Sequence, residues 1–157
     1  MAPRVIEPRV LASMDEVQQV IDEPLGTTEW VEIDQESVDR FAALTGDEQW
    51  IHVDTERAAS SAYGGTIAHG YLTLAKLPAF AATLYRLEAG ASRLNYGVNK
   101  VRFPAPVPVG SRIRATPTIV GVREVPAGDQ VTVRWVVECD RATKPVCVAE
   151  TLTLVVK

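Results

Sequence analysis

The sequence predicts an α+β fold in which an antiparallel sheet wraps around one long helix. The segment Gly70–Arg86 is so densely apolar that a helix there should be buried on nearly every side. After Gly90 the chain changes to long strands. Among these, Val131–Cys139 alternates apolar and polar residues with the period of two that a half-buried strand shows. A buried helix followed by successive antiparallel strands is typical of the α+β class.

The N-terminal region, residues 1–26, is expected to form a loose arm followed by a short helix. Ser13 and Glu16 have the spacing of a capping box, which marks the start of that helix. A second helix should follow Asp34, which is a good N-cap residue. It should stop at Gly46, because glycine readily adopts the left-handed conformation that ends helices.

One strand is expected before the buried helix and four after it. They are Thr27–Ile33, Leu94–Phe103, Arg112–Val122, Val131–Cys139 and Pro145–Val156. Turn-forming residues at Gly128-Asp129 and Arg141–Lys144 predict hairpins between the last three strands. Pro78 lacks a backbone donor and should kink or split the helix Gly70–Arg86, which is still predicted as one helix.

The whole chain, residues 1–157, is predicted to be a single domain, because no linker interrupts it. Long strands leave sheet edges that proteins usually pair or cover. A homodimer with joined sheets is therefore expected.

Composition and charge narrow the classes of partner. The net charge of −4 argues against a nucleic-acid partner, which needs a basic surface. Charged residues near the N-terminus interrupt any signal peptide, and His69 and Pro78 break the apolar segment too soon for a membrane span. A cytoplasmic location is expected, with Cys139 and Cys147 as buried free thiols.

Asp47 and His52 are the candidate catalytic pair. A carboxylate and an imidazole five residues apart on a loop can converge on one water molecule, as general acid–base catalysis requires. Gly70, at the start of the buried helix, offers a backbone N–H for a substrate carbonyl. Taken alone, Asp47 would be a turn residue and His52 a structural histidine. Their combination with Gly70 favours the catalytic interpretation.

Other polar residues are given supporting roles. Gln49, Trp50, His69 and Tyr71 are expected to pack behind the catalytic pair or to line the substrate pocket, and no metal site is expected, because a closed ligand set is missing. Lys100, Arg102, Arg112 and Arg114 share one parity on two strands that were expected to be neighbours. They are interpreted either as a solvated sheet face or as a site for the phosphates of coenzyme A.

The segment from Phe41 to His52 resembles the motif of the MaoC-like, or (R)-specific, enoyl-thioester hydratases. The step Ile67-Ala68-His69-Gly70 and the segment Val101–Gly110 match the same family. Gln49-Trp50 replaces the usual Asn-Pro, which is the form of a subgroup resembling nodulation protein N. Pro78 lies where some members have a hydroxyl side chain directed at the acyl pocket.

The resemblance implies a hot-dog fold, a dimer, and reversible hydration of trans-2-enoyl thioesters to (R)-3-hydroxyacyl thioesters. It assigns catalysis to Asp47 and His52, and binding of the thioester carbonyl to Gly70. The implied substrate is an acyl-CoA or acyl-carrier thioester, and no cofactor is needed beyond the coenzyme A of the substrate. The alternatives are a hot-dog thioesterase and a non-catalytic subunit that binds acyl thioesters.

Overall fold

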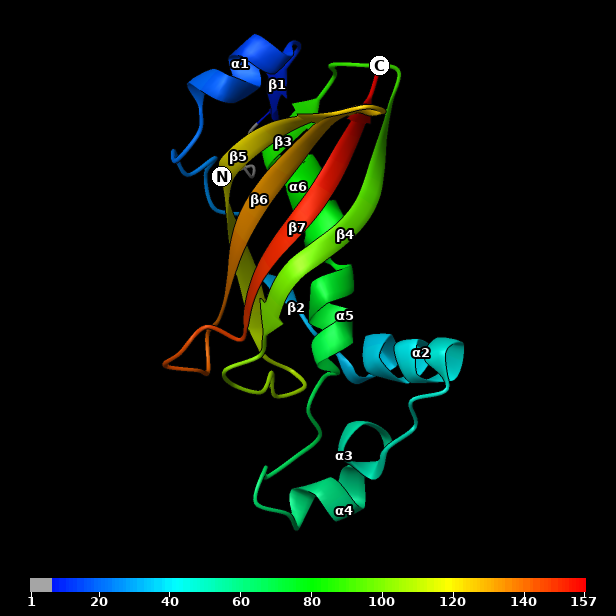
Figure 1. The fold of residues 1–157 in the computed structure, drawn as a ribbon. Coiled ribbons are helices and arrows are strands. Elements are labelled where there is room, and N and C mark those ends of the chain that lie inside the picture. The colour runs from blue at the N-terminus through cyan, green and yellow to red at the C-terminus, as the bar shows by residue number, and fades with distance from the viewer. Residues whose placement is uncertain (1–6) are drawn as a thin grey trace.

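The main element of the computed structural model is a five-stranded antiparallel sheet with the order β2-β5-β6-β7-β4. The model describes residues 7–157, so the first six residues of the predicted arm lie outside it. The strands are β2 (Val31–Glu32), β4 (Ser92–Arg102), β5 (Arg112–Val125), β6 (Gly128–Cys139) and β7 (Cys147–Val156). Figure 1 shows the sheet curling around a helical segment, which confirms the predicted α+β, hot-dog architecture.

The four strands after the helix were predicted to within a few residues, and both predicted hairpins are present. The first strand is shorter than predicted. Only Val31 and Glu32 join the ladder with β5. The N–H groups of Thr28 and Ile33 still donate to the carbonyls of Ala115 and Ser111, at 3.0 and 2.9 Å, so this segment follows the sheet edge without forming regular pairs.

The segment predicted as one helix is divided into α5 (Gly70–Ala75) and α6 (Leu77–Leu84). The break falls at Lys76, and Pro78 lies in the first turn of α6. Proline is tolerated there because the first N–H groups of a helix have no partner within it. The prediction of a single helix was therefore wrong.

The end of the predicted helix is a short strand, β3 (Tyr85–Leu87), which pairs in parallel with β1 (Arg9–Leu11). Part of the predicted loose arm is thus ordered. Leu11 is only 1% exposed and belongs to the core cluster. A three-residue strand has too little pattern to be predicted, but burial of its leucine fixes it in place.

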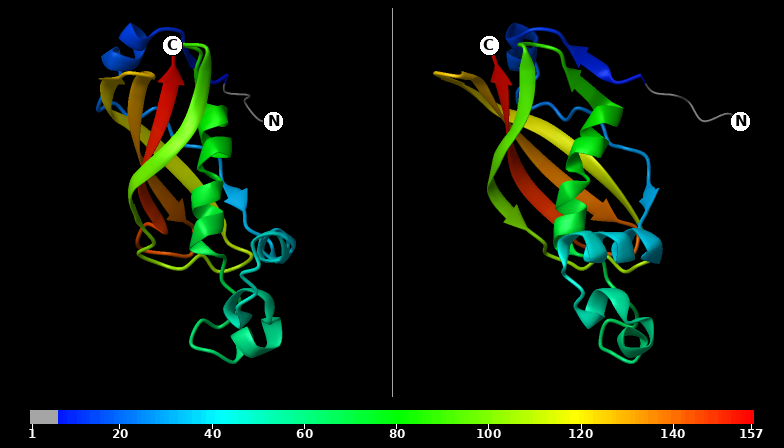
Figure 2. Two further views of the ribbon diagram at one scale, coloured as in Figure 1. Left: turned by 45° about the vertical axis from the view of Figure 1, so that its right-hand side comes forward. Right: turned by 90° about the vertical axis from the view of Figure 1, so that its right-hand side faces the viewer.

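The core lies between the helix pair α5–α6 and the concave face of the sheet (Figure 2). Leu77 and Phe80 of α6 and Trp135 of β6 are nearly completely buried in it. Burial stabilises the fold by roughly 1.5–3 kcal/mol for each such aliphatic or phenyl side chain. The opposite side of the helix pair is open, and Tyr71 is 69% exposed there. The expectation of a helix buried nearly all round is therefore wrong for the single chain.

Four short helices complete the fold: α1 (Met14–Gln19), α2 (Gln35–Thr45), α3 (Trp50–Val53) and α4 (Thr55–Ala59). Ser13, Asp34 and Asp54 cap α1, α2 and α4 through their side chains. In Figure 1, α2, α3 and α4 lie together at the end of the sheet where α5 begins. Among residues 7–157, no helix has the length and apolarity that a membrane span requires.

Candidate active site

Asp47 follows directly after the end of α2. Gly46 ends that helix in the left-handed conformation, with φ of 77°, and its N–H donates to the carbonyl of Ala42. This reversal directs the chain from α2 toward α3 and leaves Asp47 exposed in the connecting loop. The predicted helix stop is confirmed, and its position determines where the carboxylate lies.

His52 lies on α3, a helical turn that was predicted as loop, and its side chain is buried. Its Nδ1 is 2.6 Å from the carbonyl oxygen of Ile67. A carbonyl oxygen only accepts, so Nδ1 bears the hydrogen and donates it. In the neutral ring Nε2 is then unprotonated, and its lone pair can accept a proton.

His69 contacts both members of the candidate pair. Its Nε2 donates to the backbone carbonyl of Asp47 at 2.8 Å, and its ring stacks on that of His52. The ring is 2% exposed, and its Nδ1 has no hydrogen-bond partner within residues 7–157. His69 thus contacts both Asp47 and His52, and its supporting role stays a prediction.

Asp47, His52 and His69 each have a polar side-chain atom within 4.8 Å of those of the other two. This is the spacing of a metal-site candidate, but the imidazole rings have the wrong orientation. A metal ion binds a histidine nitrogen in the plane of its ring at about 2.0–2.1 Å. The His52 and His69 planes are stacked with a tilt of 25°, so a single ion does not lie in both.

Gly70 is the first residue of α5 and lines a cavity of about 310 Å³ together with His52, Tyr63, Ile67, Thr73 and Phe103. Its N–H has no intrahelical partner, because it belongs to the first turn. A Cβ atom at this position would lie 2.7 Å from the Phe103 ring, so a larger residue would require the ring or α5 to shift.

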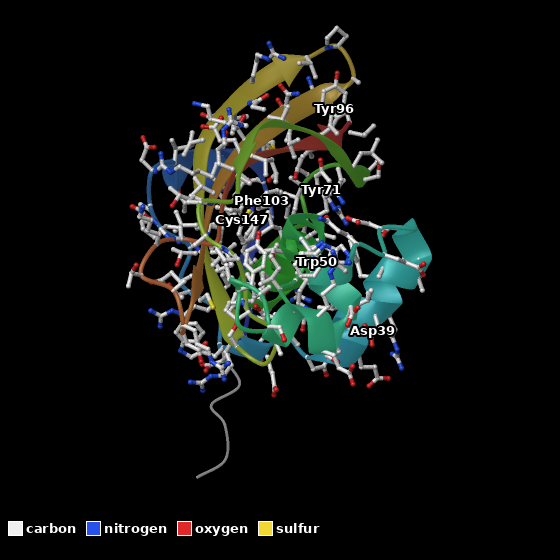
Figure 3. The ribbon with its side chains drawn as sticks, turned by 90° about the horizontal axis from the view of Figure 1, so that it is seen from below. Asp39, Trp50, Tyr71, Tyr96, Phe103 and Cys147 are labelled. Carbon is white, nitrogen blue, oxygen red and sulfur yellow. The ribbon has the colours of Figure 1, made fainter. Side chains whose placement is uncertain are left out.

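The lining of this cavity does not include Asp47 or the predicted supporting residues Gln49, Trp50, His69 and Tyr71. Gln49 is exposed, and its carbonyl accepts from the His52 N–H at 2.9 Å. Trp50 packs beneath the guanidinium of Arg57, 4.3 Å from the ring centroid. Figure 3 shows Tyr71 beside Phe103, and their rings meet edge to face at 6.1 Å.

Tyr63 lines the cavity beside His52 and was not predicted. It lies in the small-residue loop before Gly64-Gly65 and is half exposed. A tyrosine among small residues was the only signal in the sequence, and nothing there indicated that the loop returns to His52.

The prediction of one basic stripe is wrong, because β4 and β5 are not neighbours: β6 and β7 lie between them in the sheet. Arg112 forms an ion pair with Asp140, with Nε and Oδ2 2.9 Å apart. Hydrogen bonding to the backbone and side chain of Arg112 lowers the pKa of the Asp140 carboxyl. Arg112 therefore cannot share a phosphate site with Lys100 and Arg102, which lie on β4.

A second cavity, of about 410 Å³, lies between the helix pair α5–α6 and strands β4 and β7. Its lining includes Leu74, Leu77, Pro78, Val98, Trp135 and Leu152. Thr73 of the first cavity and Leu74 of the second are adjacent along α5. Both cavities have mainly apolar linings, and the first also contains the His52 ring and the Tyr63 and Thr73 side chains.

The chain matches the MaoC like domain family over residues 16–141. It is 50% identical over 145 residues to 3-hydroxyacyl-thioester dehydratase Z of Mycobacterium tuberculosis (strain ATCC 25618 / H37Rv), covering 92% of this chain and 96% of the relative. It is 39% identical over 146 residues to nodulation protein N of Rhizobium leguminosarum bv. viciae, covering 91% of each. Its fold is similar to that of the unliganded R-hydratase PhaJ1 from Pseudomonas aeruginosa. That similarity has a TM-score of 0.63 and 25% identity, and covers 84% of this chain and 81% of that one.

Proposed function

Because the chain belongs to the MaoC-like family, as its motif predicted, we propose that it catalyses the reversible hydration of trans-2-enoyl thioesters to (R)-3-hydroxyacyl thioesters. Its class is that of a hydro-lyase, in keeping with the 50% identical dehydratase relative. The observation that carries the proposal is the convergence of Asp47 and His52. Their polar atoms lie within 4.8 Å of each other, and His52 lines the same cavity as Gly70.

In the hydration direction, one water molecule is held by two acceptors. The Asp47 carboxylate and the bare Nε2 of His52 each accept a hydrogen from water, which leaves an oxygen lone pair for C3 of the enoyl group. As the C–O bond forms, one of the pair takes a proton from water. The pair then returns a proton to C2, so no net proton is gained or lost. General acid–base catalysis of this kind contributes about 10²–10⁴-fold.

Addition at C3 places negative charge on the thioester carbonyl oxygen. The Gly70 N–H, at the start of α5, is assigned as the donor to that oxygen. Loss of one such donor in other enzymes costs about 3–4 kcal/mol in transition-state stabilisation. The Phe103 ring packs against Gly70 on the side where a Cβ would lie.

The acyl chain is assigned to the 410 Å³ cavity, because it is the larger of the two, its lining is mainly apolar, and its Leu74 is adjacent in sequence to Thr73 of the first cavity. The coenzyme A or carrier portion of the substrate would then extend from the cavity toward solvent. Lys100 and Arg102 on β4 stay candidates for its phosphates. The reaction requires no metal or redox cofactor, and coenzyme A enters only as part of the substrate.

A homodimer is proposed to form through β4. This strand is a sheet edge with an open backbone ladder, and it exposes Leu94, Tyr96 and Val98 by 51%, 64% and 51%. Apolar edge strands of this length are usually paired. A second copy supplies an identical edge, and pairing would join the two sheets. The predicted cytoplasmic location is retained as part of this proposal.

The test is a hydration assay with crotonyl-CoA. The absorbance of the conjugated enoyl group measures hydration, and a thiol reagent measures release of free coenzyme A. The proposal expects loss of enoyl absorbance without thiol release, and an (R)-3-hydroxybutyryl product. Asp15→Asn, an Asp-to-Asn change on the distant α1, is the matched control and should leave the rate unchanged. Thiol release as the main reaction would support a thioesterase instead, and binding without turnover would support the non-catalytic subunit.

A further inference from the structure

We infer that Gln35 is a positioning residue for His52. Its single amide group joins three parts of the site. Nε2 donates to the His52 backbone carbonyl at 2.7 Å and to Asp39 Oδ1 at 2.9 Å, while Oε1 accepts from the Thr66 hydroxyl at 2.6 Å. Asp39 lies one turn further along α2 (Figure 3).

These contacts fix which end of the amide faces which partner. A backbone carbonyl and a carboxylate only accept, so both must face the NH₂ group. The Thr66 hydroxyl then donates to the amide oxygen. Gln35 is half-buried in the first turn of α2, directly after the N-cap Asp34, so its backbone is held by the helix. Both donors and the acceptor are used, which leaves the side chain one orientation.

The contacts connect the segment that bears the His52 ring with the segment that holds the ring in place. Thr66 directly precedes Ile67, whose carbonyl accepts the Nδ1–H of His52. The Ile67 N–H also donates to the Ile51 carbonyl, which joins the same two segments, and the Val109 N–H donates to the Thr66 carbonyl. The Gln35 side chain hydrogen-bonds both segments and is not part of the cavity lining.

The chemical consequence concerns the tautomer of His52. While the Ile67 carbonyl stays 2.6 Å from Nδ1, the neutral ring bears its hydrogen there and Nε2 is free to accept a proton. If the segments around Thr66 and His52 move apart, this preference is lost. Part of the population then bears hydrogen on Nε2 and cannot act as a base. Gln35 thereby controls the fraction of molecules with a competent His52.

Gln35→Met keeps the length of the side chain and removes all three hydrogen bonds. Gln35→Glu keeps an acceptor for Thr66 but places a carboxylate oxygen against the His52 carbonyl and Asp39. Thr66→Val removes only the hydrogen bond from Thr66 to Gln35 and serves as a second variant if Gln35→Met does not fold. Glu36→Gln is the matched control, because Glu36 is the next residue of the same turn, is exposed and pairs only with Arg40 among the described residues.

The decisive readout is the tautomer of His52 in the folded protein, observed by long-range ¹⁵N–¹H NMR. The chain has two histidines, so a single assignment variant separates them. Wild type and Glu36→Gln should show hydrogen on Nδ1 of His52, whereas Gln35→Met and Thr66→Val should shift the population toward Nε2. A Gln35 variant with the wild-type tautomer pattern would overturn the inference.

Kinetics provide the second readout, and this part alone depends on the proposed function. For crotonyl-CoA hydration, Gln35→Met should lower kcat between about 10-fold and 100-fold, as misplaced catalytic groups do, with KM within about twofold. In a His52→Gln background the same change should have no further effect. An unchanged kcat, or an undiminished effect in that background, would contradict the inference. If wild type does not hydrate crotonyl-CoA, the proposed function fails and the tautomer alone decides.

Discussion

The imidazole rings of His52 and His69 stack with their centroids 3.7 Å apart and their planes at 25°. His69 also holds the backbone carbonyl of Asp47 through Nε2. The buried His69 ring thus packs against the candidate base His52 and holds the loop that bears Asp47. The Phe41 ring also contacts His69, with ring centroids 5.0 Å apart and planes at 56°.

Replacing His69 separates these two effects. His69→Phe keeps an aromatic ring beneath His52 but removes the hydrogen bond to Asp47, so the loop should move and kcat should fall by about 10-fold or more. His69→Gln keeps a donor but loses the stack. The kcat of crotonyl-CoA hydration is measured for both variants, and circular dichroism confirms that they fold. Wild-type kcat in both variants would contradict a positioning role.

Gly70→Ala tests the assigned carbonyl donor. The added Cβ would meet the Phe103 ring at 2.7 Å, so α5 or the ring must shift. A displaced N–H should lower kcat by about 10²-fold or more, with little change in binding. Gly70→Ala combined with Phe103→Leu relieves the contact and should recover part of the rate. If Gly70→Ala is fully active, the donor lies elsewhere.

The sequence alone was sufficient for the fold class and for the proximity of Asp47 and His52, whose catalytic role stays a prediction. The alternation of Val131–Cys139 and the density of Gly70–Arg86 are local patterns, and Asp47 and His52 are only five residues apart. Gln35 could not be predicted, because its partners His52 and Thr66 become neighbours only through the fold.

The basic stripe failed for a related reason. Consecutive strands were expected to pair, but the connection after β4 pairs with the segment before α5. The Ala68 N–H donates to Val107, and Ile67 bridges to Pro108. The chain therefore crosses from β4, at one edge of the sheet, to β5 on the other side of β6 and β7. No local pattern in the sequence encodes that crossing.

Filling the apolar cavity should change chain-length preference. Ala81 lines the 410 Å³ cavity, and Ala81→Phe reduces the space available to an acyl chain. The kcat/KM for octenoyl-CoA should fall by about 10-fold or more relative to that for crotonyl-CoA, because lost burial costs about 0.8 kcal/mol per CH₂. Competition kinetics with both substrates measure the ratio. An unchanged ratio would place the acyl chain elsewhere.

Charges on β4 should disrupt the proposed dimer. Tyr96→Glu and Val98→Lys each place a charge on the exposed apolar edge, where pairing with the same strand of a second copy would bury it. Sedimentation velocity should show a dimer for wild type and a monomer for Tyr96→Glu. Arg123→Glu on β5 is a control at a position away from β4. A monomeric wild type would contradict the β4 interface.

The central claim is that Asp47 and His52 act as one unit on water, and the most direct test is the kcat of crotonyl-CoA hydration for Asp47→Asn, His52→Gln and the double variant. Each single change should lower kcat by about 10²–10⁴-fold. The double variant should be little worse than the poorer single variant, because groups that act as a unit are not additive. Single variants that keep kcat within about twofold of wild type would contradict the account.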